Sequence, residues 1–253
     1  MRKITALIVC FLLSFCIKAS ANSHIPVLLY HDLQPSYAPE KAVITITPQR
    51  FEEHISTLLK HGYTPVSFED VYNASVGNYT LPQKPIIISF DDGYDTNYKY
   101  AFPIIQKYRV KTTIFVVVGT VGKVLETSVH FDWQQARIMQ QSGLVSIQSH
   151  TYSHYDLATL NAFQLEREFR LSKYLIEKNL GTKCDIVAFP YGSCNQQVVD
   201  AAKRAGYKVT AQVGETGTNP LSDAGKVPFT RITAYGSWNG EDLIRIIKHY
   251  SVK

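Results

Sequence analysis

Short apolar runs alternate with longer segments of helical periodicity along most of the chain, and this alternation constrains the fold more than any other feature. The clearest run, Ile86–Phe90, follows Pro85 and is rich in β-branched residues. Such runs are typical of strands that are buried on both faces of a parallel sheet. We expect about seven strands of this kind. They cover residues 26–30, 86–90, 112–118, 144–148, 185–189, 207–212 and 227–233.

Helical segments separate the apolar runs, and several of them begin at a recognisable cap. Thr47-Pro48 predicts a helix with Thr as the N-cap and Pro at the first position, and Gly62 marks its end. Ser67 and Asp70 predict a capping box at the start of a second, short helix. Further helices are expected at residues 96–108 (where Pro103 could kink the helix), 133–142, 158–179, 195–205 and 241–250, with a loop at 119–132.

This regular alternation predicts βαβ units that form a parallel sheet or barrel. A chain of 253 residues suits one α/β domain with a large core. The sequence has neither a Gly-x-Gly-x-x-Gly motif nor a P-loop, which disfavours an open nucleotide-binding sheet. The predicted fold class is therefore α/β, with a barrel favoured over an open doubly wound sheet.

The N-terminus has the pattern of a secretory signal peptide. Met1-Arg2-Lys3 precedes an apolar run, Ile4–Ile17, and the segment ends in Ala19-Ser20-Ala21. The apolar run is short for a membrane span, although a retained anchor is the alternative interpretation. We predict a signal peptide at residues 1–21, cleavage after Ala21, a mature domain at residues 22–253 and no stable membrane span after cleavage.

Charge and cysteine content narrow the class of protein further. Three of the 26 Lys and Arg residues lie in the predicted signal peptide, which holds no acid, so the mature chain carries 23 basic and 21 acidic residues. This near balance gives no case for nucleic-acid binding. The mature chain keeps Cys184 and Cys194. The predicted strand 185–189 between them would extend over roughly 16 Å, whereas a bridge needs Cα atoms within about 7 Å, so we do not expect a disulfide.

Two adjacent carboxylates, Asp91 and Asp92, follow the strand 86–90 directly. Loops at the C-terminal ends of parallel strands are where α/β proteins bind ligands. Neighbouring carboxylates repel each other unless a cation or a proton holds them. A surface turn is the alternative interpretation, because Asp92-Gly93 is a common turn dipeptide.

A pair of histidines, His150 and His154, follows another predicted strand. On a helical turn this spacing would place both imidazoles on one side, within reach of one metal ion. With Asp92 as the third ligand, they form a set suited to a divalent transition metal such as zinc, cobalt, nickel or iron. Solvated loop histidines are the alternative. Because both motifs follow strands, we expect them to lie on one face of a barrel.

The remaining chemistry of such a site would be acid–base catalysis. Asp91 could take a proton from a water molecule activated by the metal. The turn Pro190-Tyr191-Gly192, after another strand, could supply the Tyr191 N–H as a donor to an oxyanion. The sequence has no Gly-x-Ser-x-Gly elbow to support a serine hydrolase.

These motifs resemble those of the polysaccharide deacetylases, the NodB-homology enzymes of carbohydrate esterase family 4. Ser89-Phe90-Asp91-Asp92-Gly93 is similar to their Thr-Phe-Asp-Asp-Gly motif, and His150-Thr151-x-x-His154 to their His-Ser/Thr-x-x-His motif. The resemblance spans roughly residues 24–235. It implies a distorted (β/α)7 barrel, Asp91 as the base, Asp92, His150 and His154 as metal ligands, and removal of acetyl groups from N-acetylated sugars.

Two departures from the family pattern raise questions. Ala188 stands where the family's third motif usually has an Arg that pairs with the base, and Arg231 is our candidate for its replacement, with a surface arginine as the alternative. The general acid of the family, a late histidine, is unclear here, because His249 is the only histidine after His154.

Other residues bear on the substrate. The N-terminal pattern around His31, together with Trp133 and the third motif without Arg, resembles the exported subgroup that acts on poly-β-1,6-N-acetylglucosamine. His31 is a candidate catalytic residue in the same pocket, or a structural histidine bonded to the backbone. Trp133, like Pro190 and Tyr191, is a candidate for substrate binding, or else packs in the core at a helix start.

The sequence thus favours an exported, periplasmic or secreted, metal-dependent N-deacetylase of N-acetylglucosamine polysaccharide, expected to be a monomer. An O-acetyl esterase for xylan-like glycans and a carbohydrate-binding protein with little turnover are the alternatives.

Overall fold

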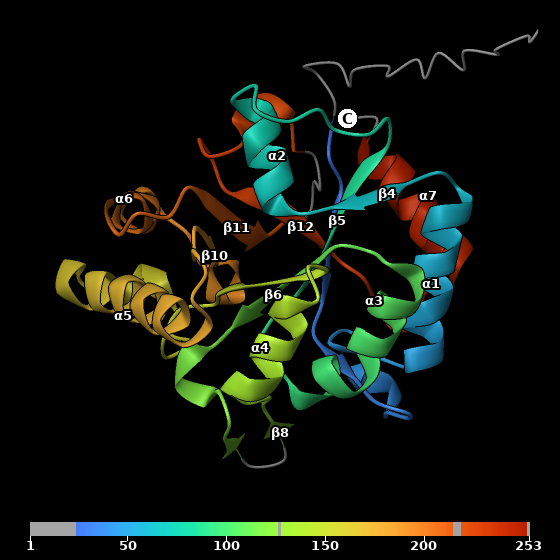
Figure 1. Ribbon diagram of the computed structural model, residues 1–253, viewed down its shortest axis with the longest axis horizontal. Coiled ribbons are helices and arrows are strands. Elements are labelled where there is room, and N and C mark those ends of the chain that lie inside the picture. Colours follow the sequence, from blue (N-terminus) through green and yellow to red (C-terminus); the bar gives the residue numbers. More distant parts are fainter. Residues whose placement is uncertain (1–23, 126–127, 215–218, 252–253) are drawn as a thin grey trace, which may run out of the picture.

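The computed structural model describes residues 24–125, 128–214 and 219–251. Seven parallel strands close into a barrel in the order β1-β12-β11-β10-β9-β6-β5, with β5 paired back to β1 (Figure 1). This confirms the predicted (β/α)7 architecture. The strands are β1 (Val27–Tyr30), β5 (Pro85–Phe90), β6 (Thr112–Val116), β9 (Val145–Ser149), β10 (Ile186–Ala188), β11 (Val209–Val213) and β12 (Phe229–Thr233).

Three further pairings lie outside this ring. β4 (Thr64–Val66) pairs with Pro85–Ile87 at the start of β5. β2 (Asp32–Leu33) follows β1 and pairs with β3 (Thr45–Ile46). The expected loop at 119–132 holds an antiparallel pair instead, formed by β7 (Val124–Leu125) and β8 (Ser128–Val129).

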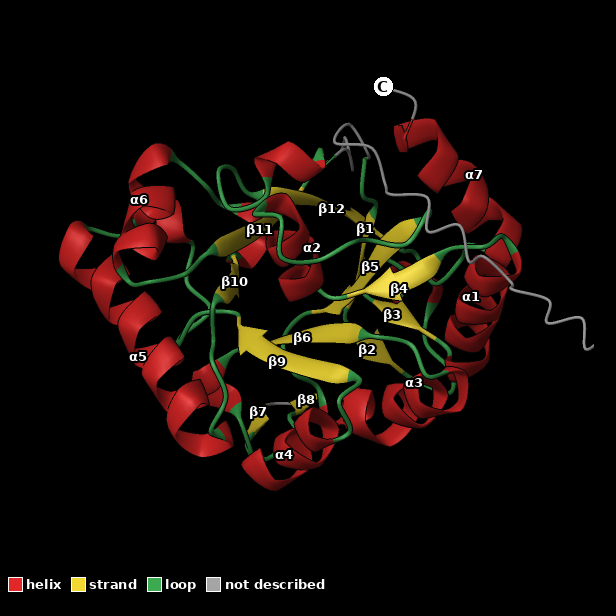
Figure 2. Cartoon of the chain, turned by 45° about the horizontal axis from the view of Figure 1, so that its top comes forward, coloured by secondary structure: helices red, strands yellow, loops and turns green. Residues whose placement is uncertain are grey.

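Helices form the outer layer of the barrel (Figures 1 and 2). α2 (Phe68–Ser75) differs from the others, because its Phe68 and Val71 pack into the barrel interior with inward-facing strand residues. Its Tyr72 also lines a small pocket with Ile186 and Val209, the residues at which β10 and β11 begin. It therefore closes the end of the barrel where the strands begin. The outer helices are α1 (Pro48–Lys60), α3 (Phe102–Tyr108), α4 (Trp133–Gln141), α5 (Ala162–Leu180), α6 (Gln196–Arg204) and α7 (Gly240–Ser251).

Local hydrogen bonds explain where several helices begin. The Thr47 side chain accepts a hydrogen bond from the Arg50 N–H, and Ser67 forms the predicted capping box with Asp70. The prediction that α5 begins at residue 158 is wrong. Asn161 forms a capping box with Gln164, so the helix starts at Ala162, and residues 157–159 form a separate 3₁₀ turn.

The predicted helix at residues 96–108 is divided into two parts. Asn97–Ala101 forms a π-helical turn, and α3 continues from Phe102 with Pro103 in its first turn. Proline has no N–H to donate, so Pro103 interrupts the regular hydrogen-bond pattern of a helix, and here a π-helical turn precedes it. The π-helical turn begins at Asn97, shortly after the Asp91-Asp92 motif, and such turns are frequent at functional sites.

The core has two layers, and successive strand residues alternate between them. The interior layer includes Val27, Ile87, Phe115, Ala188 and Phe229. The outer layer lies between the strands and the helices. It includes the residues next in sequence to those of the interior layer, such as Leu28, Ile88 and Ile114. This alternation decides which side chains reach the interior at the far ends of the strands.

Two further findings concern covalent and membrane features. Cys184 and Cys194 are both free thiols, which confirms the prediction that they do not form a disulfide. Within the described residues, no helix has both the length and the apolar character needed to cross a membrane. The predicted signal peptide, residues 1–21, lies outside the described residues.

Candidate active site

Four polar side chains occupy inward-facing positions where the strands end. His31 continues the alternation of Val27 in β1, Asp91 that of Ile87 in β5, and Arg231 that of Phe229 in β12. His150 follows β9, in which Val145 and Ile147 face the outer layer. A period of two therefore directs all four residues towards the barrel axis at one end.

Asp91 and Arg231 form a buried ion pair inside this end of the barrel. Arg231 Nη1 lies 2.6 Å from Asp91 Oδ1, and Nη2 lies 2.7 Å from Oδ2, which is a bidentate arrangement. Arg231 is fully buried, and its guanidinium lies 5.3 Å from the centroid of the Phe115 ring. The prediction that Arg231 replaces the missing motif arginine is confirmed, and the alternative of a surface arginine is wrong.

The pair keeps Asp91 ionised. Burial by itself raises the pKa of the Asp91 carboxyl, but the positive charge of Arg231, followed by that of His150, outweighs burial and holds the pKa below its ordinary value. His31 acts in the same direction. The site therefore contains a desolvated carboxylate that is charged at neutral pH and can accept a proton.

Asp92 is turned away from its neighbour by an unusual backbone conformation. Its φ is 71° and that of Gly93 is 76°, both in the left-handed region. Gly93 also lacks room for a side chain, because a Cβ there would lie 3.0 Å from Val116 Cγ1. The two residues thus bend the chain so that Asp91 and Asp92 can have different partners.

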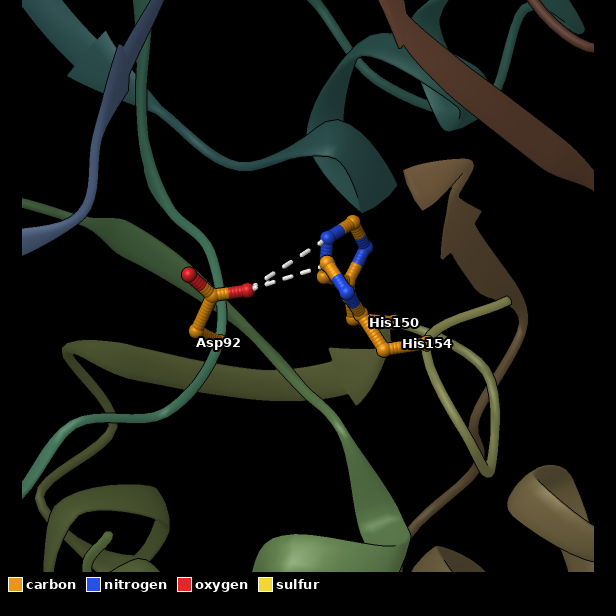
Figure 3. Close-up of side chains that lie close together, drawn as sticks. All are labelled: Asp92, His150 and His154. Atoms are coloured by element: carbon orange, nitrogen blue, oxygen red, sulfur yellow. Dashed lines mark ion pairs between the residues drawn. The ribbon is translucent and has the colours of Figure 1, made fainter. Parts of the chain in front are cut away.

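The histidine pair lies in a loop after β9, contrary to the expectation of a helical turn. Thr151 and His154 both have left-handed φ values, 66° and 60°. Asp92 Oδ1 is 3.7 Å from His150 Nε2 and 3.4 Å from His154 Nε2 (Figure 3). One ligand atom from each of the three residues lies within 4.8 Å of the others, so the predicted Asp–His–His set is brought together.

Hydrogen bonds on the far side of each imidazole orient it for a metal. His150 Nδ1 lies 2.9 Å from the Ala188 carbonyl oxygen, and His154 Nδ1 lies 3.1 Å from the Tyr191 hydroxyl. Both rings therefore present Nε2 to Asp92, as histidine ligands with an outer hydrogen bond do. Burial lowers the pKa of His150, which favours the neutral form that binds a metal. The donor set, its tautomers and its spacing fit one divalent transition ion.

The histidine loop is fixed by a carboxylate that the sequence analysis did not identify. Glu168 in α5 is buried, and its Oε2 accepts hydrogen bonds from the N–H groups of Tyr152 (3.0 Å) and Ser153 (2.7 Å). At the start of the loop, Ser149 Oγ accepts one from the Thr151 N–H. The loop thus depends on α5, not on a helical turn of its own.

The other predicted site residues have different surroundings. The Tyr191 ring is exposed and packs edge-on against His154, with centroids 4.7 Å apart, while Pro190 is buried at the start of the same turn. His31 Nδ1 is buried and has no hydrogen-bond partner among the described residues. The catalytic and substrate roles of these three residues stay predictions.

Trp133 begins α4, is half-buried and packs against the outer layer of the core. This agrees with the packing alternative, and its role in substrate binding also stays a prediction. Tyr94 was missed, although it follows Asp92 closely. Burial, followed by the charge of Asp92, raises the pKa of its hydroxyl, which places it beside the metal-binding residues.

Comparisons with known proteins agree with this site. The sequence model of the polysaccharide deacetylase family matches residues 78–210. The Bacillus subtilis (strain 168) protein YxkH, which carries the family's name, is 30% identical over 200 residues, or 78% of this chain and 68% of YxkH. The solved Streptococcus pyogenes deacetylase PplD, in complex with acetate, has a TM-score of 0.79 and 27% identity over 89% of this chain and 99% of that chain. The chain belongs to the polysaccharide deacetylase family.

A further relative bears on the subgroup. The poly-β-1,6-N-acetyl-D-glucosamine N-deacetylase of Escherichia coli (strain K12) is 24% identical over 274 aligned residues, which cover 86% of this chain and 40% of that protein. The chain thus spans less than half the length of this relative. The predicted resemblance to that subgroup within the family is confirmed.

Proposed function

We propose that this protein is a metal-dependent hydrolase that removes acetyl groups from the N-acetylglucosamine units of a polysaccharide. One observation carries the proposal: the ionised Asp91, paired with Arg231, lies beside the three converging donors of Asp92, His150 and His154. Family membership supports the reaction, and the name of the Escherichia coli relative supports the sugar.

Asp92, His150 and His154 would hold one divalent transition ion, with zinc, cobalt, nickel and iron as candidates. When bound, such an ion supplies a Lewis acid that polarises an acyl oxygen and makes water more acidic. The protein's part is to keep the Nε2 atoms of both histidines directed at the ion. The Ala188 carbonyl and the Tyr191 hydroxyl perform that part.

Asp91 acts as the base. As the oxygen of the attacking water bonds to the acetyl carbon, Asp91 accepts the proton that this water loses, and Arg231 keeps the carboxylate ionised until then. The backbone N–H of Tyr191 stabilises the negative charge that develops on the acyl oxygen.

His31 is our candidate for the acid. When the C–N bond breaks, the leaving nitrogen needs a proton, and the products are acetate and a free amine on the sugar. His31 occupies an inward position, and its charge acts on both Asp91 and Asp92. Its buried Nδ1 has no partner among the described residues, so the ring is free of a backbone bond at that atom.

The test is acetate release from defined N-acetylglucosamine oligosaccharides and from acetylated xylan, with metal-stripped and reloaded protein. We expect release from the N-acetylated sugars only, lost on stripping and restored by a divalent ion. Release from xylan alone would identify an O-acetyl esterase instead. Binding of the oligosaccharides without release from any of them would favour a carbohydrate-binding protein.

Export is part of the same proposal. The basic start, apolar run and Ala-x-Ala end of residues 1–21 support a signal peptide, and a polysaccharide substrate outside the cell would require one. N-terminal sequencing of the protein recovered from the periplasm or medium should give Asn22 as the first residue. A chain that keeps residues 1–21 would contradict cleavage after Ala21.

A further inference from the structure

The two ends of the barrel carry opposite net charge. Because the seven strands of the ring are parallel, the segments that lead into them lie at one end, here called the strand-start end. These segments are residues 24–26, 76–84, 109–111, 142–144, 181–185, 205–208 and 219–228. They hold six basic and two acidic residues, so this end is basic.

The opposite end, which holds Asp91 and Asp92, is acidic. The segments that follow the strands there are residues 31–47, 91–101, 117–132, 150–161, 189–195 and 234–239. Their described residues include three basic and seven acidic side chains. The near balance of charge over the whole chain therefore conceals two ends of opposite sign.

The basic side chains of the strand-start end reach solvent, whereas its acids have partners within the protein. The basic residues are Lys84, Arg109, Lys111, Lys183, Lys208 and Lys226, and only Lys111 is half-buried. Asp185 pairs with Lys208 at 2.7 Å, and Asp70 of α2 pairs with Lys111 at the same distance. Within the described residues, Lys183 and Lys226 form no ion pair. The outward charge of this end is therefore positive.

Helix ends add to this charge. The last turns of the outer helices contribute Lys60, Lys107, Lys178, Lys203 and Lys248. Such residues complement the partial negative charge at a helix C-terminus, which explains their position. The same effect does not explain Lys84, Lys183 and Lys226, which lie outside the helices. These three indicate that the positive charge serves a contact outside the fold.

Exposed apolar side chains accompany the lysines. Val76 and Tyr79 lie in the segment between α2 and β5, and Val227 precedes β12 directly after Lys226. Anionic lipids attract lysines through their headgroups, and the interface below accepts apolar and tyrosine side chains. A nucleic-acid backbone would match the lysines but not these residues. The combination therefore favours a lipid surface.

The path of the chain agrees with this partner. His24 forms a β-bridge with Pro220, and β1 begins three residues later at Val27. The chain before residue 24 therefore meets the barrel at the strand-start end. A leader inserted in a membrane, as predicted for residues 1–21, would hold this end next to the lipid.

We propose that the strand-start end binds the surface of an anionic lipid bilayer, and that the end with Asp91, Asp92 and the histidine pair consequently faces away from the lipid. The contact is peripheral and electrostatic, and it does not depend on the proposed reaction. It gives the protein an orientation in which a polymer outside the bilayer reaches the catalytic end.

The test removes charge from one end at a time. The strand-start variant combines Lys183→Gln, Lys203→Gln and Lys226→Gln. The matched control combines Lys41→Gln, Lys99→Gln and Lys123→Gln, three exposed lysines in segments that follow strands. We would measure partition onto sedimented vesicles of phosphatidylcholine, with and without about one third phosphatidylglycerol, together with Tm and acetate release from soluble oligosaccharides. All variants share the N-terminus of the recovered wild type, so a retained leader would contribute equally to each.

We expect the wild type to bind the anionic vesicles at about 0.1 M salt and to be released at about 1 M, where the Debye length falls to about 3 Å. The strand-start variant should bind on the order of a hundredfold more weakly, because each lysine near an anionic surface contributes about fivefold. The control should bind like the wild type, since its lysines lie further from the lipid than the Debye length of about 10 Å at 0.1 M.

Wild-type partition in the strand-start variant, or an equal loss in the control, would overturn the proposal. So would equal binding to neutral and anionic vesicles. Binding to a duplex DNA oligonucleotide without binding to the vesicles would overturn the assignment to lipid. Acetate release from soluble oligosaccharides should be the same in all three proteins, so a failure of the proposed reaction leaves the vesicle result intact.

Discussion

The two halves of the site, one at the end of β5 and one after β9, are built in different ways. Asp91 is held by strand geometry and by one charged partner, Arg231, which lies 140 positions away in sequence and across the barrel interior. His150 and His154 are held by a loop with two left-handed residues, and this loop is bonded to α5 by backbone N–H groups. The carboxylate half thus depends on electrostatics, and the histidine half on the shape of a loop.

This difference separates charge control from metal control. Changes at Asp91 and Arg231 should alter protonation and leave metal binding largely intact, whereas changes in the histidine half should act first on the metal. The predictions below test this separation, starting with the largest expected effect.

Loss of a metal ligand should have the largest effect. His150→Ala removes one of the three donors, so we expect metal content near zero and acetate release at background. Mutation of a residue that only hydrogen-bonds to a metal ligand already lowers metal affinity by about 10–100-fold, so loss of a ligand itself should lower it by more. Metal content is measured by elemental analysis of the purified variant. His249→Ala, at an exposed histidine, is the control. Unchanged metal content would remove His150 from the ligand set.

Asp91→Asn should separate the base from the metal. The amide keeps the shape of the side chain but accepts no proton, so turnover should fall by about 10²–10⁴-fold, the size of a general-base contribution. Metal content should stay at the wild-type level, in contrast to His150→Ala. Stoichiometric metal with wild-type turnover would move the base to another residue.

Arg231→Ala should shift the pH dependence. Ionised Asp91 is the active form, and Arg231 lowers its pKa, so removal of Arg231 raises that pKa and moves the acid limb of kcat/KM to higher pH by roughly 1–3 units. The dependence of kcat/KM on pH is measured at saturating metal concentration. Arg204→Ala, at an exposed arginine, is the control. An acid limb at the wild-type position would show that Arg231 does not tune the base.

The same variant should also be less stable. Removing one partner leaves the Asp91 charge buried and unpaired, which costs about 3–5 kcal/mol of unfolding free energy. Adding Asp91→Asn to Arg231→Ala neutralises the second charge and should restore part of this loss. With Asp91→Asn also measured alone, a double variant whose loss of unfolding free energy equals the sum of the two single losses would contradict an energetic coupling between the two residues.

The sequence predicted those parts of the molecule that depend on local pattern. Buried strands, caps such as Thr47, and both ligand motifs are local features, and the parallel barrel then places the motifs at one end. Arg231 could be inferred only as a candidate, yet its period-two relation to Phe229, which packs inside the barrel, was a usable sign that it faces inward. Strand alternation similarly marks His31 as inward-facing.

Features that depend on tertiary contacts could not be predicted. The spacing of His150 and His154 fits a helical turn equally well, and only the contact with α5 shows that the segment is a loop. In sequence, Glu168 is one of several acids in an amphipathic helix, and its buried position follows from how that helix packs. The π-helical turn after Asp92 and the small β7–β8 pair likewise have no distinct local pattern.

Glu168 gives the smallest and most specific test of the comparison. Its carboxylate accepts two N–H groups from the loop, and it does not touch the metal-binding atoms themselves. Glu168→Gln keeps an acceptor oxygen but loses the charge, so the two hydrogen bonds weaken without disappearing. We expect metal affinity to fall by about tenfold, in the range for outer partners of metal ligands. Turnover at saturating metal should stay close to wild type, because Asp91 and Arg231 are unaffected.

Glu166→Gln is the matched control, since Glu166 lies two residues away on the same helix but is exposed and paired with Arg170. Glu168→Ala extends the series, because it leaves both N–H groups without an acceptor and should weaken metal binding further. A structural role alone would lower Tm equally in the presence and absence of metal. A positioning role instead predicts that excess metal recovers most of the loss in Glu168→Gln. If metal affinity is unchanged in both Glu168 variants, the histidine half holds its shape without α5, and the contrast with the carboxylate half fails at this point.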